Sequence, residues 1–381
     1  MVSRGGRICV TGMAWSTALG TGVADVWKSL LAGDSGLADI GSPRPLRNTR
    51  AAVVSEVALD RPAWERQLDL TKTTLAQAVA DAGLPAGDPR IRPVLGTSYG
   101  PHLELSDTRS LSRWSAVAAR ECGYADDAVT VTTACSAGSD ALVTGAALLM
   151  AEAADICVCG GVDVLTIGKR MGHSSLGTMS PTDLRAFDVR HDGTLLGEGA
   201  AFLVLERARS ARDRGARVHG ILAGTGSAND ASSAVAPDRS GANVRRAVHR
   251  ALRAAEVGTE DISVINAHGS GTAVNDEVEA AAYAHLFEGA RRPPVVFATK
   301  GAFGHTLGAT GAMEAIALVQ ALHTGMVPPV HALTAPIPEL ALPIPKRDPM
   351  DVRSGAGISV TLGFGGFDTC LVFRAGGGDR A

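Results

Sequence analysis

The stretch Gly197-Glu-Gly-Ala-Ala-Phe-Leu-Val-Leu-Glu-Arg-Ala208 is echoed near the carboxyl end by Gly363-Phe-Gly-Gly-Phe-Asp-Thr-Cys-Leu-Val-Phe-Arg-Ala375. Each copy is a glycine-rich turn, then a hydrophobic strand, then Arg-Ala. Repetition at such a distance indicates duplication of a whole structural unit rather than a short solenoid repeat. We therefore predict two similar halves, residues 1–210 and 211–381, with the boundary near residues 208–217.

Elsewhere, apolar strand-like runs alternate with alanine-rich stretches of helical period, which is typical of an α/β protein with buried sheets. Strands are predicted at residues 8–11, 94–96, 128–132, 156–158, 201–205, 263–266, 295–298 and 357–361. Helices are predicted at residues 23–31, 72–81, 137–153, 242–254, 276–287 and 309–322. The polar stretch 209–217 is expected to be a solvated connection or the exposed end of a strand.

The composition argues against several classes of partner. A net charge of -3 provides no electrostatic footprint for nucleic acid or an anionic membrane. No apolar run is long enough for a secretory signal or a membrane span. Six cysteines without paired metal-binding spacings fit a reducing compartment, so we expect a cytoplasmic protein with free thiols and no bound metal. Cys157 and Cys159 point to one side of an apolar strand, where packing is favoured over a metal or redox role.

The first candidate for chemistry is Cys135, in Val129-Thr-Val-Thr-Thr-Ala-Cys-Ser-Ala-Gly-Ser-Asp-Ala-Leu142. A strand there leads through small residues into a long alanine-rich helix, and the cysteine falls at the start of that helix. Free backbone amides and the positive end of the helix dipole favour the thiolate, and hence attack on a thioester. On this segment alone, a small core residue is the alternative.

The second candidate is His268, in Ile265-Asn-Ala-His-Gly-Ser-Gly-Thr272. An apolar strand delivers the histidine into a turn whose glycines let a bulky ligand approach the backbone. Ser270 and Thr272 offer hydroxyl groups to an amide-bearing arm. The alternative is a capped turn before a helix at Asp276.

A third run, Ala298-Thr-Lys-Gly-Ala-Phe-Gly-His-Thr-Leu-Gly-Ala-Thr-Gly-Ala-Met-Glu314, places Lys300 and His305 before another alanine-rich helix. A lysine and a glutamate near a histidine can form an ion pair that holds the orientation and tautomer of the imidazole. The alternative is a surface ion pair of little energetic value.

The last run, Ser359-Val-Thr-Leu-Gly-Phe-Gly-Gly-Phe-Asp368, is a glycine-lined strand end in which Phe364 can adopt more than one conformation. Backbone amides at such a place can stabilise an oxyanion. A simple β-bulge would also require these glycines, and this segment alone favours the bulge.

Together, in this order and over most of the chain, these runs resemble the β-ketoacyl synthase family of thiolase-fold condensing enzymes. Residues 7–12 and 27–36 resemble the family's first strand and following helix, and residues 185–200 resemble its central segment. The resemblance implies a thiolase fold, in which duplicated βαβαβαββ halves form a five-layered α-β-α-β-α core. The first half would carry the nucleophilic cysteine and the second half the two histidines.

The resemblance also implies roles for the candidate residues. Cys135 would be the acyl-accepting nucleophile, and His268 and His305 the paired histidines of the catalytic site. Lys300 and Glu314 would form the supporting ion pair, and the hydroxyls of Ser270 and Thr272 would contact phosphopantetheine. Phe364 would be the gating residue, and its amide would join that of Cys135 in an oxyanion hole.

The implied mechanism is ping-pong. The cysteine takes an acyl group from a carrier-protein thioester, and a malonyl-type thioester then loses its carboxylate to give an enolate that attacks the acyl-enzyme. Neutral imidazoles would stabilise the enolate charge. No cofactor is expected to be bound, because the substrates are carried on the phosphopantetheine of an acyl carrier protein. A homodimer, or a heterodimer with a ketosynthase-like subunit, is expected in fatty acid or polyketide biosynthesis.

The sequence departs from the family pattern at several positions. Ser270 and Val360 stand where threonine and asparagine are usual, and Phe367 and Asp368 stand where residues are smaller or polar. The last three changes are expected to alter the pocket floor or the gating loop. The stretch between residues 100 and 129 is a few tens of residues shorter than in chain-elongating members, which leaves acyl-chain length and homodimerisation open.

Three other functions stay open on the sequence. Acyl transfer without carbon–carbon bond formation would use the same acyl-cysteine. A chain-length partner subunit shares the fold but generally lacks the nucleophile, which Cys135 supplies here. A thiolase would need a second catalytic cysteine, and the single candidate, Cys370, lies in an apolar run that favours core packing.

Overall fold

The computed structural model describes residues 7–100, 102–104, 110–125 and 127–376. The strands of the first half are β1 (Ile8–Ser16), β2 (Leu37–Asp39), β3 (Arg50–Ala52), β4 (Ile91–Gly96), β5 (Val129–Val131), β6 (Ile156–Asp163) and β7 (Gly199–Arg207). Those of the second half are β8 (Gly220–Asn229), β9 (Ile262–Asn266), β10 (Val295–Phe297), β11 (Met326–Val327), β12 (Met350–Asp351), β13 (Ala356–Gly363) and β14 (Phe367–Ala375).

The first half contains helices α1 (Val23–Leu31), α2 (Ala63–Asp81), α3 (Arg113–Glu121), α4 (Ala137–Met150), α5 (Ile167–Ser175) and α6 (Ala208–Asp213). The second contains α7 (Ala242–Ala255), α8 (Ala273–Leu286), α9 (Lys300–Phe303) and α10 (Thr310–Thr324). Short 3₁₀ turns lie at η2 (His102–Glu104), η3 (Ala134–Ser136), η4 (Thr259–Asp261) and η5 (Leu307–Ala309). Among the described residues, no helix is both long enough and apolar enough to span a lipid bilayer.

The main sheet has the strand order β10-β9-β13-β14-β8-β1-β7-β6-β4-β5, so each half supplies one side of it. In the first half, β7 is antiparallel to β1 and β6, and β4 runs parallel to β6 and β5. The second half repeats this pattern with β14, β8, β13, β9 and β10. The halves join where β1 pairs with β8. The predicted duplication is therefore confirmed in the strand pairing.

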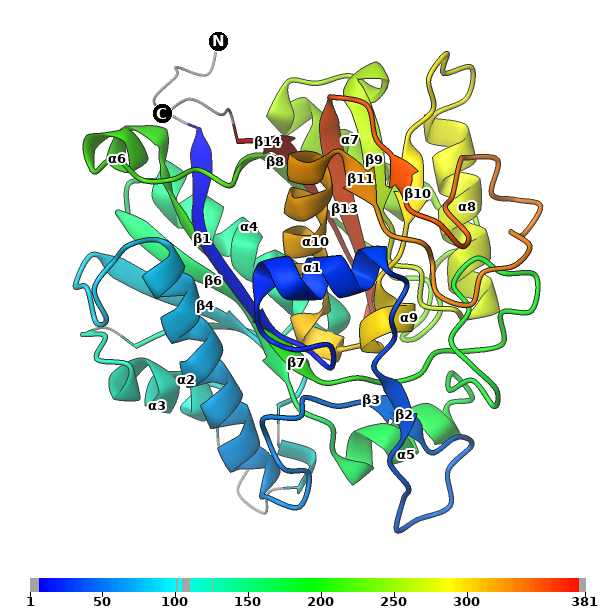
Figure 1. Ribbon diagram of the computed structural model, residues 1–381, viewed down its shortest axis with the longest axis horizontal. Coiled ribbons are helices and arrows are strands. Elements are labelled where there is room, and N and C mark those ends of the chain that lie inside the picture. Colours follow the sequence, from blue (N-terminus) through cyan, green and yellow to red (C-terminus); the bar gives the residue numbers. More distant parts are fainter. Residues whose placement is uncertain (1–6, 101, 105–109, 126, 377–381) are drawn as a thin grey trace.

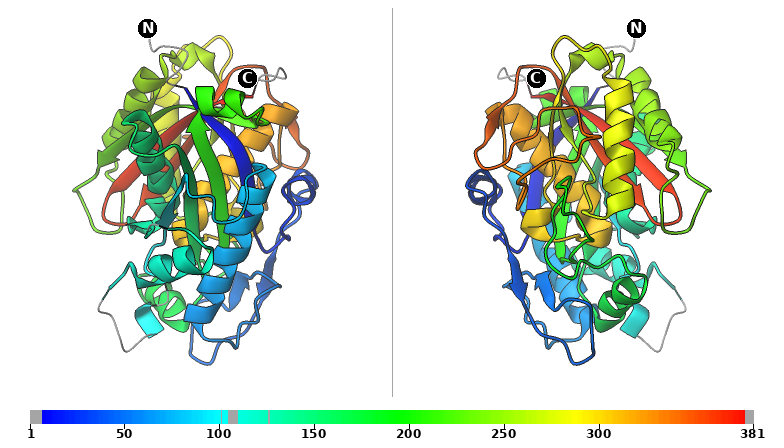
Figure 2. Two further views of the ribbon diagram at one scale, coloured as in Figure 1. Left: turned by 90° about the vertical axis from the view of Figure 1, so that its left-hand side faces the viewer. Right: turned by 90° about the vertical axis from the view of Figure 1, so that its right-hand side faces the viewer.

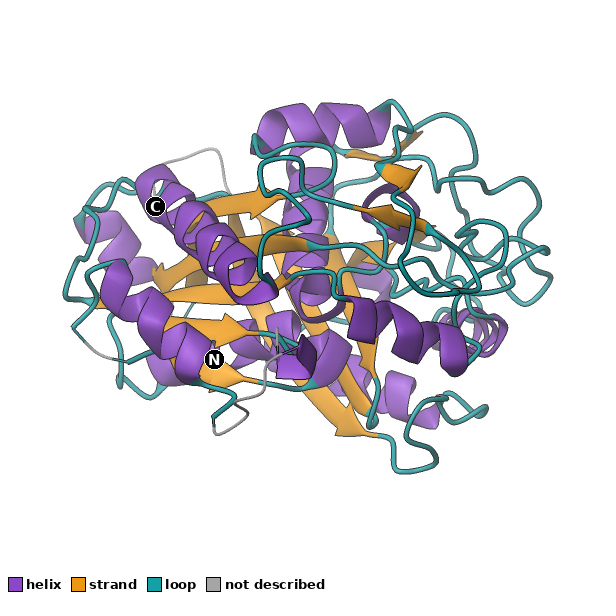
Figure 3. Cartoon of the chain, turned by 90° about the horizontal axis from the view of Figure 1, so that it is seen from below, coloured by secondary structure: helices purple, strands orange, loops and turns teal. Residues whose placement is uncertain are grey.

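Helices complete the layers. The central helices α4 and α10 pack against each other, and α10 contacts strands of both halves. Figure 1 shows α10 between β1 and β13, and Figures 2 and 3 show further helices on the outer faces of the strands. One outer layer is α2 against β1 and β7, and the other is α7 against β8 and β14. This arrangement is the expected five-layered α-β-α-β-α core.

Strand β8 was absent from the sequence prediction because its segment is rich in small residues. Gly224 and Gly226 allow α7 to approach closely, since an added Cβ would lie 2.5 Å and 2.3 Å from backbone oxygens of that helix. Helices α3 and α5 were also not predicted, α2 begins well before residue 72, and α6 occupies part of the expected connection at 209–217. Strand β8 is thus stabilised by close packing against α7 and not by large hydrophobic side chains, so it lacks the hydrophobic pattern by which a strand is predicted.

Two similar turns lead into the central helices and position the residues with chemical potential. Ala134 has φ 51° at the start of η3, immediately before α4, and Leu307 has φ 52° at the start of η5, immediately before α10. Such left-handed backbone is uncommon in residues other than glycine, and it turns the chain sharply before each helix. The first turn presents Cys135, and the second follows His305.

Candidate active site

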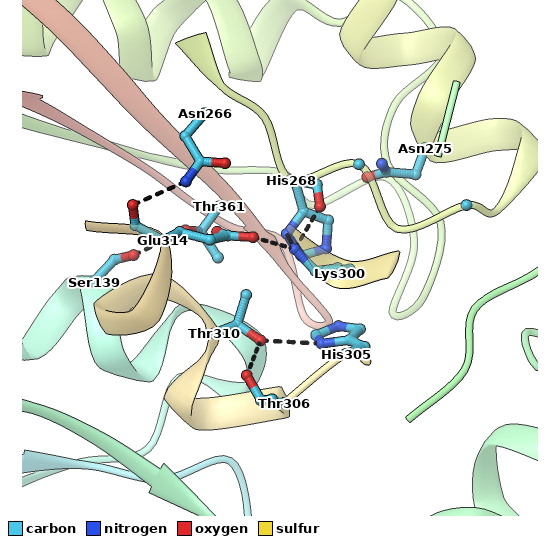
Figure 4. A network of polar contacts seen from close by, with 12 residues as sticks. Ser139, Asn266, His268, Asn275, Lys300, His305, Thr306, Thr310, Glu314 and Thr361 are labelled. Atoms are coloured by element: carbon cyan, nitrogen blue, oxygen red, sulfur yellow. Dashed lines mark hydrogen bonds and ion pairs between the residues drawn. The ribbon is translucent and has the colours of Figure 1, made fainter. Parts of the chain in front are cut away.

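One cavity of about 330 Å³ gathers residues from both halves of the chain. The predicted residues that line it are Cys135, His268, Ser270, Thr272, His305 and Phe364. Lys300 and Glu314 lie behind His268 and contact it through the lysine (Figure 4). The structure therefore brings the sequence-predicted residues together around a single space. No cluster of histidine, cysteine and acidic residues suited to a metal ion occurs in the part of the chain that the structure describes.

Cys135 lies in η3 and is buried. Its neighbour Ser136 donates a hydrogen bond of 2.5 Å to the carbonyl of Phe367, which ties this turn to the β13–β14 hairpin. The thiol itself accepts a hydrogen bond from the amide of Phe364. Burial raises the pKa of the Cys135 thiol to about 11, although the Phe364 amide and Lys300 act to lower it. The sequence-based expectation that the helix start favours the thiolate is therefore wrong for this buried thiol.

His268 follows the end of β9, and a buried carboxylate on α8 holds its turn. Glu279 accepts hydrogen bonds from the amides of His268 (2.8 Å) and Gly269 (2.7 Å). Tyr283 and Asn275 donate to the same carboxylate, which fixes its position. The helix α8 begins at Ala273, before the Asp276 start expected from the sequence. The position of His268 is thus fixed by the buried carboxylate of Glu279 on the following helix.

Lys300 satisfies its ammonium group with three acceptors around His268. It donates to Glu314 Oε1 (2.5 Å), to the carbonyl oxygen of His268, and to Nδ1 of His268 (3.2 Å). The two charged side chains are only 2% and 1% exposed, so the surface-pair alternative is wrong. Because Nδ1 accepts from the ammonium group, the neutral ring carries its proton on Nε2. Burial, Lys300 and His305 hold the pKa of His268 well below its ordinary value.

His305 has the same tautomer for a different reason. The amide of Leu307 donates to its Nδ1 at 3.2 Å, and the hydroxyl of Thr310 lies 3.1 Å from the same nitrogen. Burial, with Lys300 and His173, lowers the pKa of His305 well below its ordinary value, so the ring is neutral and protonated on Nε2. The two ring centroids are 5.3 Å apart in an edge-to-face arrangement. The cavity therefore contains two neutral imidazole N–H donors.

The β13–β14 turn carries Phe364. Gly363 pairs directly with Phe367, and Gly365 and Gly366 adopt φ values of 84° and 81°. The glycines serve a tight hairpin turn, so the β-bulge favoured by the sequence is wrong here. Ser270 and Thr272, whose hydroxyls are 2.9 Å apart, line the same cavity.

Three residues of the candidate site were missed by the sequence analysis. Glu279 holds the His268 turn, and Asp163 accepts hydrogen bonds from the amides of Ser98 (2.8 Å) and Gly308 (2.7 Å), which fixes η5. His173 on α5 lines the cavity beside Phe364. A signal existed for Glu279, which follows Asp276 by three residues on one predicted helix. His173 and Asp163 gave none, because their contacts are distant in sequence.

The departures from the family pattern have different surroundings. Val360 is buried in β13, whereas the side chain of Phe367 is 37% exposed. Asp368 is only 2% exposed and lines the cavity, and its Oδ2 atom has no hydrogen-bond partner among the described residues. Burial, together with the carboxylates of Asp230 and Glu279, raises the pKa of Asp368 to about 7.

The chain matches two family models, one for the N-terminal domain of β-ketoacyl synthases over residues 6–211 and one for their C-terminal domain over residues 219–334. It is 32% identical to a putative polyketide β-ketoacyl synthase 1 of Streptomyces halstedii, over 96% of this chain and 97% of that protein. It is 29% identical to the 3-oxoacyl-[acyl-carrier-protein] synthase 2 of Mycobacterium bovis, over 96% of each.

Among solved structures, the ishigamide ketosynthase/chain length factor superposes with a TM-score of 0.87 at 31% identity, over 97% of this chain and 99% of that one.

The alignments with the Streptomyces and Mycobacterium proteins run over 412 and 407 positions, more than the 381 residues of this chain, so these two relatives carry insertions that it lacks. The sequence places the shortening between residues 100 and 129, of which 101, 105–109 and 126 lie outside the described residues.

Proposed function

Because the chain belongs to the β-ketoacyl synthase family, we propose that it joins an acyl group on Cys135 to a malonyl-type extender by decarboxylative Claisen condensation. It is a condensing enzyme of the acyltransferase type, in fatty acid or polyketide biosynthesis. The observation that carries the proposal is the meeting of one thiol and two neutral imidazole donors in a single cavity.

In the first half-reaction the sulfur of Cys135 attacks the carbonyl carbon of an acyl thioester. A pKa of about 11 means that the resting thiol is protonated, so the proton leaves as the carbon–sulfur bond forms and ends on the departing pantetheine thiol. The amide of Phe364, which acts on the thiol in the resting site, would join the amide of Cys135 in stabilising the oxyanion of the tetrahedral intermediate.

In the second half-reaction the extender's thioester carbonyl accepts hydrogen bonds from Nε2 of His268 and His305. Loss of carbon dioxide transfers an electron pair into the enolate, whose oxygen then carries charge that the ground state lacks. Lys300 and Leu307 fix the orientation of the two imidazoles, so their hydrogen bonds become stronger as this charge develops and no reorganisation is needed. One such donor contributes a factor of about 10²–10³ to kcat. The enolate carbon attacks the acyl carbonyl, and the cysteine thiolate leaves and takes a proton from solvent.

The other functions fit the site less well. Acyl transfer alone gives no use to two imidazole donors aimed at one carbonyl oxygen. A chain-length partner needs no nucleophile, whereas Cys135 lies at a sharp turn inside the cavity. In a thiolase, Cys370 would have to exchange protons, but it is fully buried in β14 and burial raises its pKa.

The proposed partners are an acyl carrier protein and a second ketosynthase-like subunit. The hydroxyls of Ser270 and Thr272, which line the cavity, would contact the phosphopantetheine arm, and we propose no other cofactor. Exposed apolar side chains around η2 and α5 support a subunit contact: Tyr99, Leu103, Met171 and Leu176. The cytoplasm is the proposed location, and all six cysteines being free thiols fits its reducing conditions.

The first test follows acylation by intact mass after incubation with a panel of acyl carrier proteins. The Cys135→Ala variant should gain no acyl mass, whereas Cys122→Ala should be acylated like the parent, because Cys122 lies outside the cavity. Acylation that survives Cys135→Ala would exclude this cysteine as the nucleophile.

The second test follows carbon dioxide released from a malonyl carrier protein. Release should fall by at least about a hundredfold in His268→Ala and in His305→Ala. Acylation of Cys135 without any release of carbon dioxide in the parent protein would favour acyl transfer over condensation.

A further inference from the structure

One carboxyl group in the cavity wall has no part in the half-reactions described above. Asp368 lies on β14, where its strand neighbours are Leu362 of β13 and Ala228 of β8. Its side chain is 2% exposed and lines the same cavity as Cys135 and His268. Any charge on Asp368 is therefore a charge in the wall of the reaction cavity, shielded from bulk water.

Two other carboxyl groups act on Asp368, and each of them has its own hydrogen-bond donors. Asp230, just after β8, accepts from the amides of Ser232 (3.0 Å) and Asp238 (2.6 Å). Glu279 on α8 accepts from two amides, an asparagine and a tyrosine. Asp368 has no ion pair among the described residues, and its Oδ2 atom has no hydrogen-bond partner there. Nothing compensates for burying its charge, so the protonated form is favoured.

The proton on Asp368 therefore changes the charge of the cavity within the physiological range. Burial, with Asp230 and Glu279, raises its pKa to about 7, so the carboxyl group is neutral below that pH and negative above it. A malonyl-type extender ends in a carboxylate of ordinary pKa, about 4, and stays negative throughout. A simple acyl group carries no charge. The two substrates of the proposed reaction thus differ in the property that Asp368 controls.

The repulsion between two such charges is large enough to matter. Two unit charges about 10 Å apart, at an effective dielectric constant of about 20, repel strongly enough to weaken binding about 10-fold. Salt screening reduces this to about 3- to 10-fold. A Coulomb interaction acts without contact, and the whole cavity has a volume of only about 330 Å³. The argument therefore requires no particular pose of the extender.

We propose that Asp368 is a specificity-determining residue, which admits the anionic extender to the cavity when it is protonated and repels it when it is ionised. A neutral acyl group is not discriminated in this way. The inference rests on the proposed condensing function and adds a control over which of its two substrates the cavity accepts. By linkage, a bound extender also strengthens the hold of Asp368 on its proton by the same factor.

The test uses two inert analogues on one acyl carrier protein, each with an amide in place of the thioester. One ends in the malonyl carboxylate, and the other ends in a primary amide of nearly the same shape. Each inhibits acylation of Cys135, and the measured quantity is the ratio of the two inhibition constants, in which the contribution of the carrier protein cancels. Between about pH 6 and pH 8 the malonyl analogue should weaken by about 3- to 10-fold relative to the amide.

Two neutral variants, Asp368→Asn and Asp368→Leu, provide the matched controls. The ratio should be independent of pH in both, whether or not the new side chain can form hydrogen bonds. Other groups near the cavity also have shifted values: burial raises the pKa of Glu279 and that of Glu314, the latter to about 7, and Asp276 raises that of His191. The parent and both variants keep these groups, so only the contribution of Asp368 differs between them.

Calorimetry in buffers of different ionisation enthalpy gives a second readout. At about pH 7.5 the parent should take up about 0.3 to 0.5 proton on binding the malonyl analogue, because a 3- to 10-fold linkage raises the pKa of Asp368 from about 7 to between about 7.5 and 8. This uptake should be absent with the amide analogue and in Asp368→Asn. A purely structural role for Asp368 would not produce it.

A ratio that does not change with pH in the parent, or a change that persists in either neutral variant, would overturn the inference while leaving condensation intact. If acyl carrier proteins do not acylate Cys135, or if neither analogue inhibits that acylation, the proposed function itself fails, and the inference fails with it. The ratio is informative even where a variant loses overall activity, because each enzyme is compared with itself on matched analogues.

Discussion

Replacing Asp368 by asparagine is expected to stabilise the fold, and to do so more strongly as the pH rises. The carboxyl group lies on β14 against the cavity, 2% exposed, and its Oδ2 has no partner among the described residues. Burial and the nearby carboxylates of Asp230 and Glu279 raise its pKa from 3.8 to about 7. A neutral amide at this position avoids the burial of a charge.

The sign follows from proton binding. Between about pH 4 and pH 7 the folded protein keeps the proton on Asp368 while the unfolded chain loses it, so stability falls as pH rises through this window and then levels off. The rise of the pKa from 3.8 to about 7 corresponds to about 4 kcal/mol at pH 8 but only about 2 kcal/mol at pH 5. The advantage of Asp368→Asn should therefore grow by about 2 kcal/mol over that range.

Urea unfolding of the parent and the variant at several values between about pH 5 and pH 8 measures this difference. Asp188→Asn is a control that should show no change with pH over this range. Burial acts to raise the pKa of Asp188, but Arg190 and the amides of Thr334 and Ala335 hold it below the ordinary value of 3.8. The stabilisation from Asp188 is lost only as the pH falls below that ordinary value, so the cost of its replacement should be the same at pH 5 and at pH 8. A gain for Asp368→Asn that does not change with pH would refute the reasoning.

Three further predictions concern the candidate active site. Alkylation of Cys135 by iodoacetamide should keep accelerating up to about pH 10, since its pKa is about 11, and a plateau below about pH 8 would contradict this. Lys300→Met should cost about 3–5 kcal/mol in urea unfolding, because it leaves Glu314 buried without a cation; adding Glu314→Leu should restore stability but not carbon dioxide release. Gly304→Ala should slow the release of carbon dioxide and should lower the free energy of unfolding more than Gly215→Ala does. Both glycines have positive φ, but a Cβ at Gly304 would lie 2.6 Å from a backbone oxygen, whereas a Cβ at Gly215 would face open space.

The sequence was sufficient for the residues that sit in glycine-rich runs at the ends of strands. Cys135, His268 and His305 each have small neighbours that leave room for a ligand, so local pattern and spacing identify them. The protonation of the Cys135 thiol could not be predicted in the same way. The start of a helix is visible in the sequence, but complete burial is a property of the folded chain, and here burial dominates the pKa.

His173 illustrates the same limit for position. Its segment, Gly168-Lys-Arg-Met-Gly-His173, is polar and gives no reason to expect a buried ring. The stacking partner Phe364 belongs to the other half of the chain, and only the duplicated fold brings α5 against the β13–β14 turn. The position of His173 in the cavity therefore depends on contacts between the two halves, which the periodicity of the sequence within one half does not reveal.

Duplication also explains why this site needs both halves and carries a single nucleophile. The turns before α4 and α10 correspond in the two halves, with Cys135 following Ala134 in one and Gly308 following Leu307 in the other. A Cβ at Gly308 would lie 2.3 Å from the amide nitrogen of Ser98, so this turn has no room for a second thiol. Its backbone serves instead as support: the Leu307 amide sets the tautomer of His305, and the Gly308 amide is bound by Asp163 across the interface. In the proposed mechanism, one copy of the turn thus carries the acyl group, and the other orients the imidazole that would stabilise the enolate.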